Sequence, residues 1–386
     1  MGSSRNPLFK MNIGILTFHR AVNYGAFLQS YSLCKALNRE SDIKAEVIDY
    51  SMQSAWNYYD VGAWNLKKKI GSIMELAYLK KQNAVFAESV NRNKGVFSND
   101  LLVSDNMEEF RSFVKSRYDA IVVGSDEVWK ICSWRRFPNP YFLIGDYGCR
   151  KISYAASFGK TINLTANDEK KMRDYLADFE VLSVRDRFAY DYLNRNKIGN
   201  HVMLSCDPSF LYDFKEELNN CSNPLRDGSI KIDKNKKTVI VMVDDKSAET
   251  IRKQLKGEYN LVSLYRKHKG YINVTDVDPF CWLKIISEAD FVLTCFYHCM
   301  CFSICNNTPF IAIGVKGKQH KLEDLLLNSE LEKNYMSGEQ LEKANLPAEI
   351  KKRSGDTDGF ARFVSDKRSG FEEYLKLLRT DSSQNS

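Results

Sequence analysis

Short runs of apolar residues alternate with stretches in which apolar residues recur at helical spacing. The first run is NIGILT at residues 12–17, and helical spacing follows over residues 26–38. A second apolar run, EVIDY, occupies residues 46–50. A strand, a helix and a strand in this order predict the start of a parallel α/β sheet.

The same alternation continues along most of the chain. We expect residues 51–118 to be mostly helical, with a lysine-rich turn at 67–69, and the charged stretch from about residue 322 to be helical as well. The other expected elements are strands at 118–124, 151–156, 179–184, 202–207, 238–243, 260–263, 291–294 and 310–313, and helices at 248–255, 279–288 and 298–305.

The length and the turn-forming residues predict how the chain is divided. A chain of 386 residues is expected to hold two or three domains. Residues 219–237 are rich in Asn, Ser and Lys and contain Pro and Gly, which makes them the best linker candidate. We therefore expect one α/β domain over 12–218, a second over 238–320, and a helical tail over 321–386 that can cross back to the first.

Composition excludes several protein classes. With 44% apolar and 27% charged residues, the chain is neither disordered nor fibrous. A net charge of +7 suits an anionic substrate or membrane surface but falls short of a nucleic-acid signature. No apolar stretch reaches the ~18 residues of a membrane span, and the first ten residues lack the apolar core of a secretory signal. We expect a cytoplasmic protein that can associate peripherally with the inner face of a membrane.

Two loops after strand ends in the first half carry candidate chemistry, because open parallel sheets bind ligands there. In residues 19–25 (HRAVNYG) the glycine lets backbone amides approach an anion, although a plain turn with Asn23 as helix cap explains the same residues. In residues 124–129 (GSDEVW), Asp126 could act as general base on a sugar hydroxyl, or Ser125 or Asp126 could cap a helix.

Two further loops carry a cation. Arg185 follows an apolar strand and could clamp a planar carboxylate, or it could form a structural ion pair with Asp186 or Asp207. His298 lies at a strand-to-helix junction, where it could serve as a general acid or be a buried neutral histidine.

The ten cysteines are expected to be reduced thiols, because the chain is long and shows no secretory signal. Four of them flank His298: Cys295, Cys299, Cys301 and Cys305. This cluster could bind a metal or form a buried helix rich in small apolar thiols. Its spacing lacks the C-x2-C pairs of structural zinc sites, so we favour the helix and expect no metal.

Taken in order, six segments over roughly residues 12–315 resemble the polysaccharide pyruvyl transferase family. Each is modest alone, whereas the ordered set is specific. The segments are GILTFHRAVNYGAFLQSYSL at 14–33, DAIVVGSDEVW at 119–129, YAASFG at 154–159, LSVRDRFA at 182–189, DPSFLY at 207–212 and ADFVLTCFYHCMCFSICNNTPFIAI at 289–313.

The resemblance implies a fold and an activity. The fold would be like that of GT-B glycosyltransferases, with two Rossmann-like domains facing a cleft, the first on the acceptor side and the second on the donor side. The activity would be transfer of a pyruvyl group from phosphoenolpyruvate to a sugar of a capsule or exopolysaccharide precursor, forming a cyclic ketal. The sugar would be carried by a lipid diphosphate or a nucleotide, and no cofactor or nucleic acid would take part.

The resemblance also assigns roles to residues. His298 and Asp126 would be catalytic, with His298 as general acid. Arg185, His298 and Cys299 would bind the donor. The acceptor side would use three residues of the first loop: His19, Asn23 and Tyr24.

The stretch around the histidine departs from the family pattern, which reads close to T-D-S-F-H-G-T. Cys295, Phe296 and Cys299 replace its Asp, Ser and Gly, so the donor pocket is expected to be reshaped or the donor to differ. Two other functions therefore stay open: a glycosyltransferase with a nucleotide-sugar donor, and a sugar-binding protein without turnover.

Overall fold

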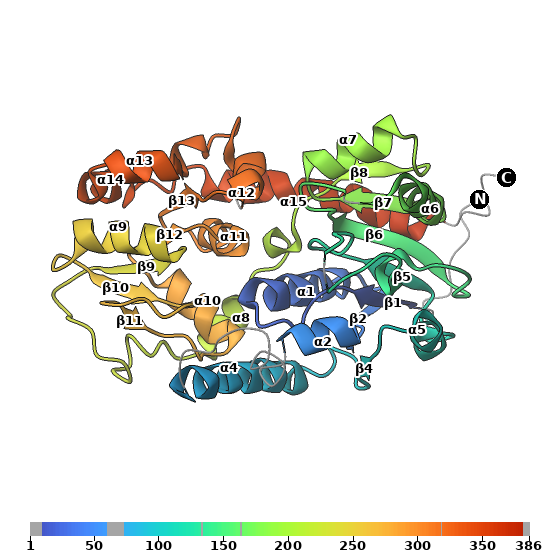
Figure 1. The fold of residues 1–386 in the computed structure, drawn as a ribbon, viewed down its shortest axis with the longest axis horizontal. Coiled ribbons are helices and arrows are strands. Elements are labelled where there is room, and N and C mark those ends of the chain that lie inside the picture. Colours follow the sequence, from blue (N-terminus) through green and yellow to red (C-terminus); the bar gives the residue numbers. More distant parts are fainter. Residues whose placement is uncertain (1–9, 60–72, 133, 163, 318, 381–386) are drawn as a thin grey trace. The chain divides into compact units, whose positions relative to one another are not determined.

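The computed structural model describes residues 10–59, 73–132, 134–162, 164–317 and 319–380 (Figure 1). Two expectations concern residues outside these ranges. One is that the start of the chain, residues 1–9, is not a secretory signal, and the other is the lysine-rich turn at 67–69. None of the helices in the described ranges is long and apolar enough to cross a membrane.

The chain forms two compact units, and their bounds differ from the expected domains. The first unit comprises Met1–Tyr212 and Arg368–Ser386, and the second comprises Asp213–Lys367. The expected linker at 219–237 packs on the second unit, because Asn223 Nδ2 donates to Glu288 Oε2 at 2.9 Å. Most of the expected tail, 321–386, also belongs to the second unit, and only its end joins the first. There Tyr374 packs edge-on against Tyr154, with ring centroids 4.7 Å apart.

The first unit is built on a sheet of six parallel strands in the order β2-β1-β5-β6-β7-β8. All four residues of β5 are buried, which explains its unbroken apolar run, since helices cover both faces of such a sheet. The strands are β1 (Met11–Leu16), β2 (Ile43–Val47), β5 (Ala120–Val123), β6 (Arg150–Ala156), β7 (Val181–Val184) and β8 (Val202–Leu204).

Helices and one small strand pair complete the first unit. The pair consists of β3 (Tyr50–Ser51) and β4 (Leu102–Val103), so the region expected to be mostly helical also holds two short strands. The helices are α1 (Tyr24–Leu37), α2 (Gln53–Tyr59), α4 (Ile73–Arg92), α5 (Met107–Val114), η1 (Pro140–Phe142), α6 (Ala166–Ala177), α7 (Arg187–Arg195), η2 (Pro208–Phe210) and the end of α15 (Phe360–Arg379).

The second unit has its own sheet of six parallel strands, in the order β11-β10-β9-β12-β13-β14. Counted along the chain within this sheet, the order is 3-2-1-4-5-6, that of dinucleotide-binding Rossmann folds. The strands are β9 (Thr238–Met242), β10 (Asn260–Ser263), β11 (Ile272–Asn273), β12 (Phe291–Thr294), β13 (Phe310–Gly314) and β14 (Tyr335–Ser337).

Strand β14 lies in the stretch expected to be helical. It is three residues long, and Tyr335 to Ser337 pair with Ala312 to Gly314 of β13. A segment this short becomes a strand because a sheet edge offers it partners, which local periodicity does not reveal. The helices of this unit are α8 (Lys215–Asn219), α9 (Asp245–Leu255), α10 (Pro279–Ser287), α11 (Tyr297–Cys305), α12 (Gln319–Leu326), η3 (Glu332–Asn334), α13 (Gly338–Lys343) and α14 (Leu346–Arg353), with the start of α15.

Each sheet has one point at which the strand order reverses. In the first sheet it lies between β1 and β5, and in the second between β9 and β12. Open parallel sheets bind ligands at the carboxyl ends of the strands on either side of such a point. The loops that begin at Thr17, Gly124 and Cys295 follow three of these strands, so the strand order places the predicted loops where ligands are expected.

Candidate functional site

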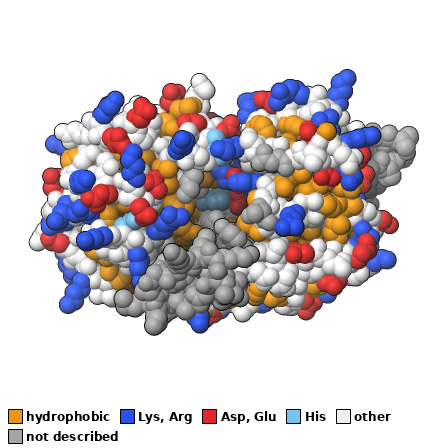
Figure 2. All heavy atoms as spheres, in the orientation of Figure 1, with side chains coloured by type: hydrophobic (Ala, Val, Ile, Leu, Met, Phe, Trp, Pro, Cys, Tyr) orange, Lys and Arg blue, Asp and Glu red, His pale blue; other side chains and the backbone are white. Residues whose placement is uncertain are grey.

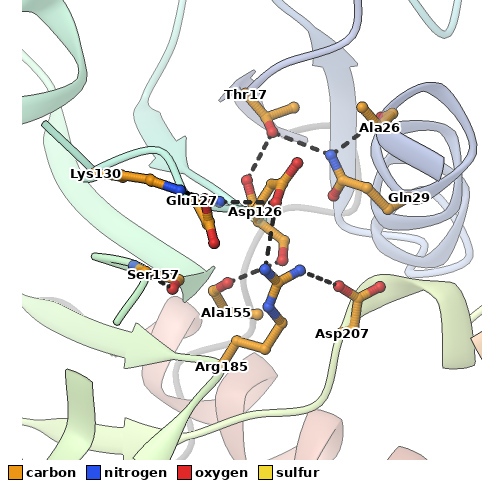
Figure 3. A network of polar contacts seen from close by, with 12 residues as sticks. Thr17, Ala26, Gln29, Asp126, Glu127, Lys130, Ala155, Ser157, Arg185 and Asp207 are labelled. Atoms are coloured by element: carbon orange, nitrogen blue, oxygen red, sulfur yellow. Dashed lines mark hydrogen bonds and ion pairs between the residues drawn. The ribbon is translucent and has the colours of Figure 1, made fainter. Parts of the chain in front are cut away.

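In the first unit, buried hydrogen bonds tie the two loops beside the reversal point together. Thr17 Oγ1 donates to the carbonyl oxygen of Ser125 at 2.8 Å, and Gln29 Nε2 of α1 donates to Thr17 Oγ1 at 3.1 Å (Figure 3). Gly124 precedes this contact with a φ of +114°, and a Cβ atom on it would lie 2.3 Å from the carbonyl oxygen of Tyr154. The loop after β5 can therefore take this course only with glycine at its start.

Beside these loops, Arg185 points between two carboxylates from different strand ends (Figure 3). One guanidinium nitrogen donates to Asp207 Oδ2 at 2.6 Å, and the other donates to Asp126 Oδ1 at 3.3 Å. Asp207 is fully buried, and its Oδ1 also accepts hydrogen bonds from the amide and the hydroxyl of Ser209. Asp186, the other expected partner, instead caps α7.

These contacts decide how Arg185 could receive a ligand. The sequence left open a ligand clamp or a structural ion pair, and the structure shows the ion pair with Asp207. The contact with Asp126 is longer than the 2.7–2.9 Å usual between charged groups. A ligand carboxylate would therefore compete with Asp126 for Arg185, and not with Asp207.

Asp126 occupies an irregular loop and caps no helix, so neither it nor Ser125 plays the capping role considered from the sequence. Its φ is +79°, and its carbonyl oxygen accepts hydrogen bonds from the amides of Val128 and Ser157 at 2.8 and 3.0 Å. Its Oδ1 accepts a hydrogen bond from the Glu127 amide at 2.8 Å. The side chain keeps 13% of its surface exposed, so a substrate hydroxyl could reach it.

His19 belongs to a buried cluster around Asp49, the second residue after β2. Its Nε2 lies 3.0 Å from Asp49 Oδ1, and since a carboxylate only accepts, Nε2 carries a hydrogen. Arg20 donates to both Asp49 oxygens at 2.5 Å, and Lys94 donates to Oδ2 at 3.1 Å. Burial alone would raise the pKa of Asp49, but the hydrogen bonds from Arg20 and His19 outweigh it and hold that pKa well below its usual range.

This burial changes the role expected of the first loop. The His19 side chain is 0% exposed, so it can affect an acceptor only through the groups that it holds in place. Asn23 caps α1 by accepting hydrogen bonds from the amides of Gly25 and Ala26. This is the plain turn that the sequence offered as the alternative to an anion-binding loop. Tyr24 is buried against Phe86, with ring centroids 4.9 Å apart, and so is a core residue.

In the second unit, His298 is the second residue of α11, which starts after a two-residue connection from β12, beside the reversal point. It is half-buried, and its ring lies edge-on to that of Tyr297 at 5.4 Å. No side chain in the described part of the chain caps α11. The amides of its first turn, together with the helix dipole, are suited to an anion.

The cysteines around His298 lie in or next to this helix, and Cys295, Cys299 and Cys301 are buried. Over the described residues, no three His, Cys, Asp or Glu side chains gather as metal ligands would. Burial raises the pKa of the Cys299 thiol to about 12, so the side chain is a neutral core group. Cys299 could contribute to donor binding only through its backbone amide.

Sequence reasoning missed a second histidine at the same edge of this sheet. His268 follows β10, is 6% exposed, and its Nδ1 lies 3.2 Å from Oδ1 of Asp245, the first residue of α9. Asn273 holds the loop by accepting from the His268 amide at 2.8 Å. The sequence offered one signal for this pair: His268 and Asp245 follow β10 and β9, which are adjacent strands. Asp49 of the first unit was missed in the same way.

Comparisons with known proteins agree with this architecture. The profile of the family described as polysaccharide pyruvyl transferase matches residues 23–317. No protein of curated function matches the chain. Among solved structures, UDP-N-acetylglucosamine 2-epimerase from Rickettsia bellii is similar with a TM-score of 0.56 and 10% identity, covering 96% of each chain. The enzyme of the same name from Methanocaldococcus jannaschii has a TM-score of 0.54 and 12% identity, covering 88% of this chain and 92% of its own.

At such identities the likeness concerns the fold alone. It confirms the predicted fold class, an α/β protein with two Rossmann-like parts of the GT-B type. The family profile covers more than half of the chain, including the loops after β5, β7 and β12. The chain therefore belongs to the polysaccharide pyruvyl transferase family.

Proposed function

We propose that this protein transfers a pyruvyl group from phosphoenolpyruvate to a sugar of a surface polysaccharide precursor and closes a cyclic ketal across two hydroxyls. The observation that carries the proposal is the family match over residues 23–317, which spans Asp126, Arg185 and His298. All three residues follow strands of the two parallel sheets at their carboxyl ends. The sugar would be carried by a lipid diphosphate or a nucleotide.

The reaction defines what the protein must supply. Protonation of the methylene carbon of phosphoenolpyruvate makes its neighbouring carbon electrophilic and similar to an oxocarbenium ion. A sugar hydroxyl attacks that carbon and loses its proton, and inorganic phosphate leaves. Departure of the phosphate makes the carbon electrophilic again, and a second hydroxyl attacks it, loses its proton to the base or the phosphate, and closes the ring. The protein needs an acid, a base, a partner for the carboxylate and a group that holds the phosphate.

We assign the acid to His298 and the phosphate contact to the uncapped first turn of α11 that carries it. A helix N-terminus favours the increasing charge on a departing phosphate. Asp126 is the base for the sugar hydroxyl, since its carboxylate is partly exposed. Arg185 is the partner for a carboxylate, through the guanidinium nitrogen that contacts Asp126 at 3.3 Å.

The proposed reaction uses phosphoenolpyruvate as co-substrate and no other cofactor. Its place would be the cytoplasm, where the chain meets sugar carriers at the inner face of the membrane. Lys and Arg outnumber Asp and Glu by 56 to 49, and a mild positive excess favours approach to an anionic surface. On the face drawn in Figure 2, the two kinds of charge are interspersed, so any such contact would be weak and peripheral.

The direct test combines phosphate release with mass spectrometry. The full chain is incubated with phosphoenolpyruvate and galactose-type acceptors, and the acceptor should gain the mass of a pyruvate ketal. His298→Ala should lower the rate about 100-fold or more, which is typical for loss of a general acid. His201→Ala removes an exposed histidine and is the matched control. The proposal fails if no acceptor gains mass and the His298→Ala variant releases phosphate like the parent.

A nucleotide-sugar glycosyltransferase is the second candidate, and one observation favours it. Cys295, Phe296 and Cys299 stand where the family usually has Asp, Ser and Gly, and two of these three side chains are buried. Calorimetry with phosphoenolpyruvate and with a UDP-sugar separates the two functions. Tight binding of the UDP-sugar alone would favour the glycosyltransferase. Sugar binding without turnover of either donor would indicate a binding protein.

A further inference from the structure

Arg135 is a buried cation in the connection between β5 and β6. The residue is 3% exposed. Its Nε donates to the Lys130 carbonyl at 2.6 Å, and its guanidinium lies 4.4 Å from the centre of the Phe18 ring and 5.0 Å from that of Trp134. Within the described ranges, one terminal guanidinium nitrogen is buried without a hydrogen bond, and Arg135 forms no ion pair.

Such an arrangement is unusual because a buried charge normally has a carboxylate beside it. Burial lowers the pKa of Arg135, and the weaker electrostatic effects of Tyr141, Cys132, Asp126 and Glu127 act against it. Two aromatic rings recover part of the lost hydration through cation–π contacts. Neither ring supplies an oxygen acceptor, so the terminal N–H groups of the guanidinium are left for a different partner.

The two carboxylates that act on Arg135 have other cations as their direct partners. Asp126 and Glu127 both act on Arg135 electrostatically. Asp126, however, contacts Arg185, and Glu127 forms an ion pair with Lys130 at 2.7 Å. The positive charge of Arg135 is therefore not neutralised by a direct contact in this part of the chain.

The position of Arg135 points to a ligand. Phe18 is the second residue after β1, and Asp126 is the third after β5, so Arg135 lies at the reversal point of the first sheet. Phe18 and Trp134 are both half-buried, which leaves part of each ring accessible. Aromatic rings pack against the apolar faces of a sugar, and a guanidinium pairs with a negatively charged group on it.

We propose that Arg135 binds an oxyanion, a carboxylate or a phosphate, on the ligand of the first unit. The N–H edge of the guanidinium would donate to two oxygens of that group, and the Phe18 and Trp134 rings would pack against the adjoining sugar. The identification of this ligand as the sugar acceptor rests on the proposed function, whereas the binding of an oxyanion by Arg135 is independent of it. A phosphate of the carrier and the carboxylate of an acidic sugar share this chemistry.

The experiment measures binding by calorimetry at low ionic strength with the full chain, without any donor. The probes are inorganic phosphate, inorganic pyrophosphate and glucuronate, with galactose as the neutral comparison. Arg135→Gln should weaken binding of at least one anionic probe by about tenfold or more. Arg136→Gln changes the exposed neighbouring arginine and should bind like the parent. Loss confined to the phosphates would indicate the carrier, and loss confined to glucuronate an acidic sugar.

Two outcomes overturn the proposal: no anionic probe binds the parent, or every probe binds Arg135→Gln as tightly as the parent. Thermal denaturation supplies a second readout. The anionic probe whose binding depends on Arg135 should raise the melting temperature of the parent and of Arg136→Gln by more than that of Arg135→Gln. A lower melting temperature with unchanged anion binding would show a structural role instead and would also overturn the proposal.

Arg135→Lys covers the case in which Arg135→Gln does not fold. It keeps the charge but lacks the planar fork, so binding of the anionic probe that depends on Arg135 should weaken about tenfold. Glucuronate and phosphate binding equal to the parent would contradict the proposal. Because none of these measurements involves pyruvyl transfer, failure of this proposal can be told from failure of the proposed reaction.

Discussion

Arg185 donates to Asp207 Oδ2 at 2.6 Å, and the Asp207 carboxylate has no exposed surface. The two residues follow neighbouring strands, β7 and β8, and their pairing fixes the guanidinium at the carboxyl edge of the first sheet. A buried pair of this kind is expensive to break, because removal of one partner leaves the other charge buried and unpaired.

Asp207→Ala should therefore lower the free energy of unfolding by about 3–5 kcal/mol. The measurement is urea denaturation followed by circular dichroism at pH 7. Asp213→Ala is the control, since that carboxylate is 45% exposed and pairs with Lys215 on the surface, where such pairs contribute about 0–1 kcal/mol. Equal urea midpoints for the two variants would show that the Arg185–Asp207 pair does not stabilise the fold.

The Asp49 cluster predicts a pH dependence of stability. Asp49 has a lowered pKa in the folded chain, so its ionised form contributes stability above the unfolded value of about 4. That contribution is lost as the pH falls below about 4 toward the lower folded pKa. Asp49→Asn should be less stable than the parent at pH 7, and the difference should shrink between pH 4 and pH 3. A difference that stays constant over this range would contradict the prediction.

Gly124→Ala should destabilise the first unit and lower activity, because the new Cβ would lie 2.3 Å from the carbonyl oxygen of Tyr154. Gly95→Ala is a matched control: its φ of +101° is similar, and nothing lies within 4 Å of the added atom. Gly95→Ala should thus show only the backbone strain, of about 1–2 kcal/mol, and Gly124→Ala clearly more. Similar urea midpoints for both variants would mean that the loop moves aside at little cost.

Cys299 should resist alkylation in the native chain. Its thiol pKa is raised to about 12 by burial, so very little thiolate is present at pH 8. Iodoacetamide treatment followed by peptide mass spectrometry should leave Cys299 unmodified until the chain is unfolded in urea. Cys132, which is only half-buried, should react in the native chain and is the internal control. Rapid native labelling of Cys299 would instead place its thiol within reach of a ligand.

Much of the architecture could be predicted because it depends on local patterns. The run AIVV of β5 is buried throughout, and an unbroken apolar run of that length is typical of a parallel strand with both faces covered. Asn23 caps α1, in keeping with the preference of Asn for that position. His298 lies in the first turn of a helix that follows a strand, as predicted. The bounds of the two units were missed, since the packing of 219–237 depends on the distant Glu288.

The candidate site divides in the same way. The sequence alone determined which loops follow strands, and it therefore located Asp126, Arg185 and His298 at strand ends, because apolar runs and turn residues are local signals. Only the tertiary structure decided which side chains meet. It buried His19 against Asp49, paired Arg185 with Asp207, and placed Arg135 beside the rings of Phe18 and Trp134. Strand order sets such contacts, and it brings together residues that local spacing cannot relate.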